Sequence, residues 1–120
     1  MAARLTEVVI ESADPAAAAR FWAAALGWEV KEYLPGHVPW MSSSGDPAQH
    51  DLKLVFVAAP ASRPARNRLY VNPSGADQAD EIARLCGLGA TRPESAGTTP
   101  WVGLVDPGGT ELTILPNRLD

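Results

Sequence analysis

Hydrophobic and polar positions near the start of the chain change from a period of two to a helical period. Residues 5–11 alternate and are β-branched in the middle, which predicts a strand. The alanine-rich stretch 16–26 predicts a helix. Asp14 can accept hydrogen bonds from the free amides of its first turn, Pro15 tolerates the first helical position, and Gly27 is expected to end it. The chain therefore opens with a strand and one amphipathic helix.

The remainder of the first half favours extended structure. Residues 28–33 alternate as a strand, and residues 38–43 can return antiparallel after a turn. Residues 52–58 form the strongest β pattern of the chain. The connector 60–66 carries proline and arginine without apolar periodicity, so we interpret it as the link between two halves.

The second half repeats this order. Residues 68–72 predict a strand and residues 76–88 a helix whose apolar side includes Cys86 and Leu88. Three short extended pieces are expected to follow, at 90–93, 101–105 and 110–115. The last two are joined by the turn sequence 106–109. Each half thus has the order βαβββ.

The spacing of equivalent residues supports this internal repeat. Glu7 and Tyr70 open corresponding strands, and Asp14 and Asp77 lie near the two helix starts; both pairs are 63 residues apart (70 − 7 and 77 − 14). We therefore expect a single domain over residues 1–120, built from repeats 4–59 and 67–116. Pairing two such halves lets the helices cover one sheet face while the other face curls around a cleft.

Composition narrows the class of protein. A chain of 120 residues with 46% hydrophobic residues can bury one continuous core. The net charge of −4, without a basic block, argues against nucleic acid as a partner. We expect no membrane partner and a cytoplasmic location, because no apolar stretch is long enough to span a bilayer and the only cysteine, Cys86, has no disulfide partner.

Several short motifs, taken together in order, resemble a known family. They are Ser12-Ala13-Asp14-Pro15, Phe21-Trp22, Leu26-Gly27-Trp28, Asn67-Arg68-Leu69-Tyr70, Leu88-Gly89-Ala90 and Asp106-Pro107-Gly108-Gly109-Thr110-Glu111. The chain resembles the glyoxalase-like and bleomycin-resistance-like branch of the vicinal oxygen chelate superfamily. The resemblance implies an α+β fold, that of glyoxalase, bleomycin resistance protein and dihydroxybiphenyl dioxygenase, with two βαβββ repeats forming a curved mixed sheet around a cleft. Members include metal-dependent enzymes and metal-free drug-binding proteins, so the site must decide the function.

The resemblance also implies where metal ligands would lie. Metal-binding members typically carry them on the first strand, on the strand that opens the second half and on the last strand, and these positions resemble Glu7, Tyr70 and Glu111 here. A fourth position would fall within 50–53. Two carboxylates and a phenol form a poor site for zinc or ferrous iron. We expect no cofactor, although the two carboxylates could still hold a hard divalent metal with water ligands.

Other residues have a functional and a structural interpretation. Trp40 and Trp101 occupy equivalent strands and either form an aromatic clamp facing the cleft or belong to the core. Glu7 and Glu111 either approach each other, which would let one act as a base, or lie exposed at strand ends. His50 could contribute to a ligand site, and a solvated loop histidine is the alternative that we favour.

We expect a small-molecule-binding protein, dimeric by its resemblance, that takes an apolar or aromatic ligand with Tyr70, Trp40, Trp101 and His50 around it. The alternative is a lyase or isomerase that uses Glu7 or Glu111 as its base, with or without a divalent ion.

Overall fold

The structure is a computed structural model that describes residues 3, 5, 7–31, 40–42, 52–59, 68–73, 77–93 and 101–116. The first half contains β1 (Glu7–Ser12), α1 (Pro15–Leu26), β2 (Glu29–Lys31), β3 (Trp40–Ser42) and β4 (Lys53–Ala58). The second half contains β5 (Arg68–Val71), α2 (Gln78–Gly87), β6 (Val102–Val105) and β7 (Glu111–Ile114). The predicted connector 60–66 lies outside the described residues.

The ends of both helices follow from local chemistry. The Asp14 carboxylate accepts a hydrogen bond from the Ala17 amide at 3.1 Å, and Pro15 occupies the first turn, as predicted. Gly27 ends α1 in the left-handed conformation, with φ of 72°. The Asp77 carboxylate accepts from the Ala79 amide at 2.8 Å and caps α2 in the same way. The two helix starts therefore lie 63 residues apart in the structure, as the repeat requires (77 − 14).

The described strands form two sheets. The N-terminal sheet has the order β1-β4-β3-β2, and the C-terminal sheet has the order β5-β7-β6. In each sheet the first and last strands of the half run parallel, because β1 pairs with β4 and β5 pairs with β7. The predicted α+β class is confirmed, but among the described residues the two halves do not form one continuous sheet. The edge strands β1 and β5 are not hydrogen-bonded to each other.

Two local predictions were wrong. Residues 90–93 do not form a strand; only Thr91 forms an isolated bridge, with both its N–H and its carbonyl bonded to Val105. Pro93 has no N–H with which to continue this ladder. Leu88 does not join the buried side of α2, because it caps the helix end and is 38% exposed.

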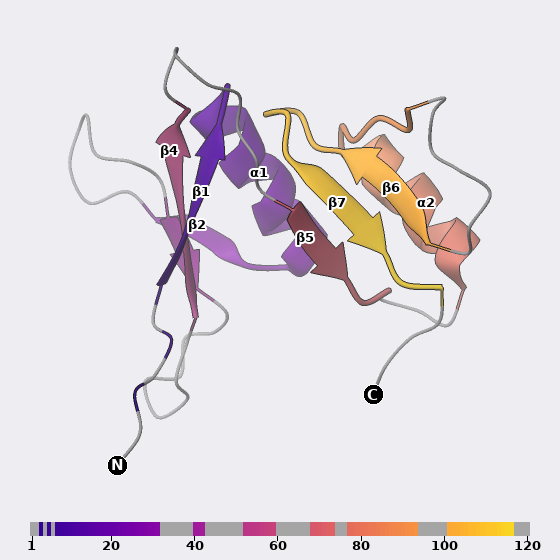
Figure 1. Ribbon diagram of the computed structural model, residues 1–120, viewed down its shortest axis with the longest axis horizontal. Coiled ribbons are helices and arrows are strands. Elements are labelled where there is room, and N and C mark those ends of the chain that lie inside the picture. The colour runs from indigo at the N-terminus through magenta and orange to yellow at the C-terminus, as the bar shows by residue number, and fades with distance from the viewer. Residues whose placement is uncertain are drawn as a thin grey trace.

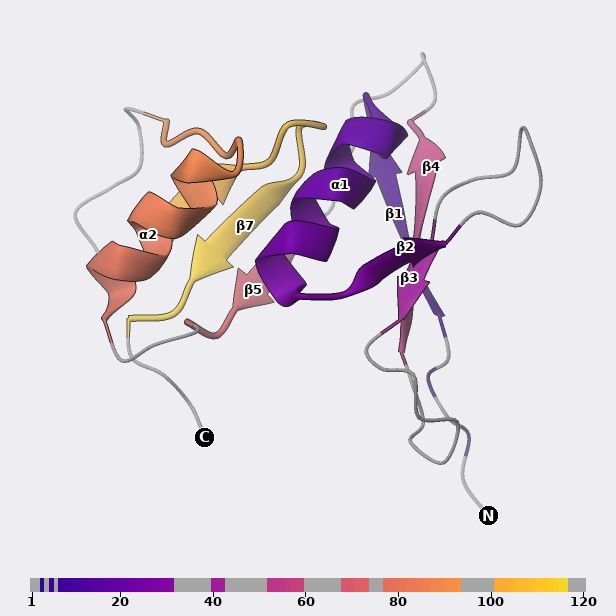
Figure 2. The same ribbon diagram turned by 180° about the vertical axis from the view of Figure 1, so that it is seen from behind.

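The layers are visible in Figures 1 and 2. Helix α2 covers one face of the C-terminal sheet, and α1 lies between the two sheets, packed against the N-terminal one. Alternate strand residues face these helices and form a single core with both of them, including Ile10, Phe56, Leu104, Leu112 and Ile114. No helix among the described residues covers the opposite face of either sheet, and we call these the outer faces.

The turn between β6 and β7 fastens the second half onto α1. The Asp106 carboxylate accepts hydrogen bonds from the amides of Gly108 and Thr110 at 2.8 and 2.9 Å, which holds the turn closed. The Gly108 carbonyl then accepts from the Ala13 amide at 2.9 Å, immediately before α1. Asp106-Pro107-Gly108-Gly109 is therefore a hairpin turn that joins the halves.

Among the described residues, no helix has the length and apolar character needed to cross a membrane.

Candidate functional site

The outer face of the C-terminal sheet is set by strand alternation. Leu112 and Ile114 on β7 are buried against α2, so Glu111 and Thr113 lie on the outer face. Val102 and Leu104 are buried on β6, which leaves Gly103 on the outer face. The residues at the centre of this outer face, Thr113 and Gly103, are therefore polar or small.

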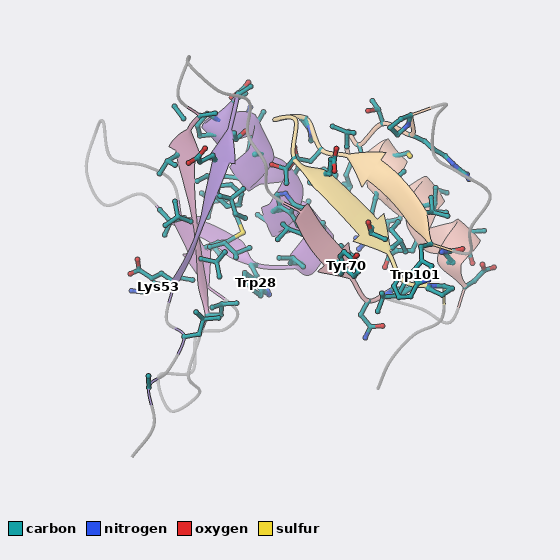
Figure 3. All side chains as sticks on the ribbon, in the orientation of Figure 1. Trp28, Lys53, Tyr70 and Trp101 are labelled. Carbon is teal, nitrogen blue, oxygen red and sulfur yellow. The ribbon has the colours of Figure 1, made fainter. Side chains whose placement is uncertain are left out.

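Two aromatic rings meet on this face. Tyr70 on β5 and Trp101, just before β6, are separated by β7, and their ring centroids are 5.9 Å apart with an interplanar angle of 52°. Tyr70 is 63% exposed and Trp101 45% exposed. Figure 3 shows both rings at the same end of the C-terminal sheet. Trp101 thus belongs to the outer face and not to the core, and the structure brings together two of the residues expected around a ligand.

A row of paired residues crosses the sheet beside these rings. Tyr70 is opposite Thr113, and Thr113 is opposite Gly103. A Cβ atom placed on Gly103 would have no heavy atom of the described residues within 4 Å, so the described part of the face is open at this point. Among the described residues, the hydroxyl groups of Tyr70 and Thr113 have no hydrogen-bond partner. The row therefore offers two hydroxyl groups and an uncovered backbone beside an aromatic wall.

The outer face of the N-terminal sheet has a different character. Ile10 on β1 and Leu54 on β4 are buried toward α1, so Glu7, Val9 and Lys53 lie on the outer face. Glu7 is opposite Lys53 in the register of β1 and β4, so an acidic and a basic residue are paired across the two strands. Figure 3 shows Lys53 on the side of the N-terminal sheet away from Tyr70 and Trp101.

The two carboxylates expected to approach each other lie on separate sheets. Glu7 opens β1 and Glu111 opens β7, and Figures 1 and 2 show these strands starting at opposite ends of their sheets, with α1 between the sheets. Both residues are exposed. Within one chain the structure does not bring them together, so their pairing as a general base stays a prediction that would need a second copy.

Two further expected site residues cannot be placed. His50 lies outside the described residues. The backbone of Trp40 is opposite Val55 in β4, and its side chain is outside what the structure describes.

The residues at the expected ligand positions do not fit a transition metal. Glu7 and Tyr70 each lie seven residues before a helix-capping aspartate (14 − 7 and 77 − 70), so they occupy equivalent positions in the two halves. Their partners on the parallel strands are Lys53 and Thr113. The positive charge of Lys53, the strand partner of Glu7, opposes a cation, and hydroxyl groups are poor ligands for zinc or iron. Among the described residues, no three His, Cys, Asp or Glu side chains are grouped to hold a metal ion.

Sequence reasoning missed Thr113 and Gly103. It placed Glu111 as the equivalent ligand position, but Glu111 is opposite Arg68, two residue pairs away from the Tyr70–Thr113 pair. Alternation within β7 puts Glu111 and Thr113 on the same face and cannot choose between them. The register of β5 against β7 makes the choice, and register depends on contacts between distant segments.

Two sheets with parallel first and last strands, each covered by a helix, agree with the fold that the motifs predicted. A family profile described as a glyoxalase-like domain matches residues 7–115. The chain belongs to this glyoxalase-like family, as its motifs predicted. No curated protein matches the chain.

Several solved structures have a similar fold. Glyoxalase I of Leishmania major is 15% identical, with a TM-score of 0.62, and the match covers 95% of this chain and 86% of that one. TnmS3, an antibiotic-binding protein from Streptomyces sp. CB03234, is 21% identical, with a TM-score of 0.58 and coverage of 99% and 98%. The oxidase ChaP-H2 is 23% identical, with a TM-score of 0.57 and coverage of 95% and 93%. At these identities the likeness concerns the fold alone.

Proposed function

We propose that this protein binds a small aromatic molecule on the outer face of its C-terminal sheet. The contact between Tyr70 and Trp101 carries the proposal, because two large rings meet while most of one and nearly half of the other remain in water. Covering apolar surface with a ligand contributes about 25 cal/mol per Å². A stacked aromatic pair adds about 0.5 to 1.5 kcal/mol beyond this burial.

The residues at the expected metal-ligand positions and the fold of the chain favour a binding protein over a metal-dependent enzyme. Lys53 and the hydroxyl groups of Tyr70 and Thr113 lie where a metal enzyme of this fold would need ligands. The similar fold of an antibiotic-binding protein supports the proposal that the fold serves binding here.

We infer that a second copy of the chain completes the site. The outer faces of the two sheets point in different directions within one chain, as the position of Lys53 relative to Tyr70 shows (Figure 3). The edge strands β1 and β5 lack a described partner on their open sides. Val9 is 54% exposed in the middle of the N-terminal outer face. A homodimer that joins unlike sheets would cover these edges and enclose Tyr70 and Trp101.

The test is a ligand-observed NMR screen of aromatic and aliphatic compounds against the wild type and Trp101→Ala. Aromatic compounds should bind the wild type, and Trp101→Ala should weaken them roughly 10-fold, because one stacking surface is lost. Leu88→Ala is the matched control, since Leu88 is also a partly exposed apolar residue but lies at the end of α2. Equal binding to all three proteins, or no binding of any aromatic compound, would show the proposal to be wrong.

A further inference from the structure

Resting on the proposed function, we propose that the site selects an aromatic ligand carrying an oxygen substituent, such as a phenol or an aryl ketone, which hydrogen-bonds to the Tyr70 and Thr113 hydroxyl groups above Gly103. These three residues form one continuous row across β5, β7 and β6.

The geometry of the rings limits the shape of the ligand. At an interplanar angle of 52°, a flat molecule can stack on only one of the two rings and meets the other with its edge. A ligand stacked on Trp101 would bring an edge toward Tyr70 and over the centre of β7, where Thr113 lies. The substituents on that edge then decide whether the contact is polar or apolar.

The row of Tyr70, Thr113 and Gly103 leaves space for the edge of the ligand and offers it polar groups. Gly103 has no side chain, and the space above it is open to 4 Å. Thr113 is half-buried, and a partly desolvated hydroxyl group gains from a ligand atom that can donate or accept a hydrogen bond. A hydroxyl group donates and accepts, so phenols and ketones both satisfy it. A hydrocarbon edge would instead leave the two hydroxyl groups unpaired.

The experiment compares 2-naphthol with naphthalene, two rings of the same shape, by titration of the protein followed in its backbone amide NMR spectrum. The wild type should bind 2-naphthol roughly 3- to 10-fold more tightly than naphthalene, as expected for one net hydrogen bond. Tyr70→Phe keeps the ring and Thr113→Val keeps the shape, and each should reduce this preference by weakening 2-naphthol without weakening naphthalene. Gly103→Val fills the open space and should weaken both compounds.

The outcomes separate this inference from the proposed function. If naphthalene and 2-naphthol bind equally, or if the preference survives in Tyr70→Phe and Thr113→Val, the hydroxyl row is not the selective element, while aromatic binding still stands. If neither compound binds, both proposals are wrong. Circular dichroism spectra confirm that each variant is folded before its binding is compared.

Discussion

The indole N–H of Trp22 donates a 2.7 Å hydrogen bond to the Asp106 carboxylate across the interface between the two halves of the chain. Both side chains are buried, at 2% and 3% exposed. The same carboxylate holds the turn that docks beside the start of α1. This bond therefore connects the core of the first half to the turn that positions β7.

Trp22→Phe should lower the free energy of unfolding by about 1 to 3 kcal/mol in urea titrations, because it leaves a buried acceptor without its partner. Trp28→Phe is the control for the change in ring size, because Trp28 is only partly buried and lies just after the end of α1. A double-mutant cycle with Asp106→Asn isolates the coupling between the two side chains. A coupling near zero would mean that the bond does not hold the halves together.

Gly108→Ala should destabilise the protein by about 1 to 3 kcal/mol, the range for overpacking a close contact. The added Cβ would overlap the Ser12 hydroxyl oxygen and lie 3.0 Å from the Ala18 Cβ. Gly103→Ala adds the same atom where nothing lies within 4 Å and should change stability by less than about 1 kcal/mol. Thermal unfolding of the two variants side by side tests this, and equal melting temperatures would contradict it.

Arg84→Ala should also destabilise the fold. The Arg84 guanidinium forms an ion pair with the buried Glu81 carboxylate, with Nε and Oε1 2.5 Å apart, and donates to the Ala25 carbonyl at the end of α1 at 2.8 Å. We expect a loss of about 1 to 3 kcal/mol, since the Arg84 side chain is 38% exposed and water partly replaces it. Arg20→Ala, at an exposed position of α1, should change the urea midpoint little. A similar loss in both variants would argue against a specific role of this contact.

Val9→Glu should weaken self-association at least about 10-fold in sedimentation velocity, because a charge would be desolvated in the proposed interface between unlike sheets. Leu88→Glu places the same charge at the end of α2, away from both outer faces, and should leave the dissociation constant unchanged. A wild type that is monomeric at every concentration would refute the dimer. Equal effects of both substitutions would show that the interface does not lie at Val9.

The positions of the helices and strands follow largely from local sequence. Asp14, Pro15 and Gly27 bound α1 as predicted, since capping and left-handed glycine depend on a few neighbouring residues. Alternation located β4 and β7 within one residue at each end of their predicted ranges. The motifs also predicted the family correctly, because their order along the chain reflects the order of these elements.

Tertiary structure decided what those elements present to a ligand. The sequence allowed Trp101 to face either the core or the outer side, and the burial of Val102 and Leu104 against α2 turns it outward, next to Tyr70. It also placed Glu7 and Glu111 as potential neighbours, and within one chain they lie on separate sheets, so their pairing stays a prediction. The reason is physical: caps and alternation act over a few residues, whereas strand register and sheet pairing depend on contacts between distant segments, such as Trp22 with Asp106 and Tyr70 with Thr113.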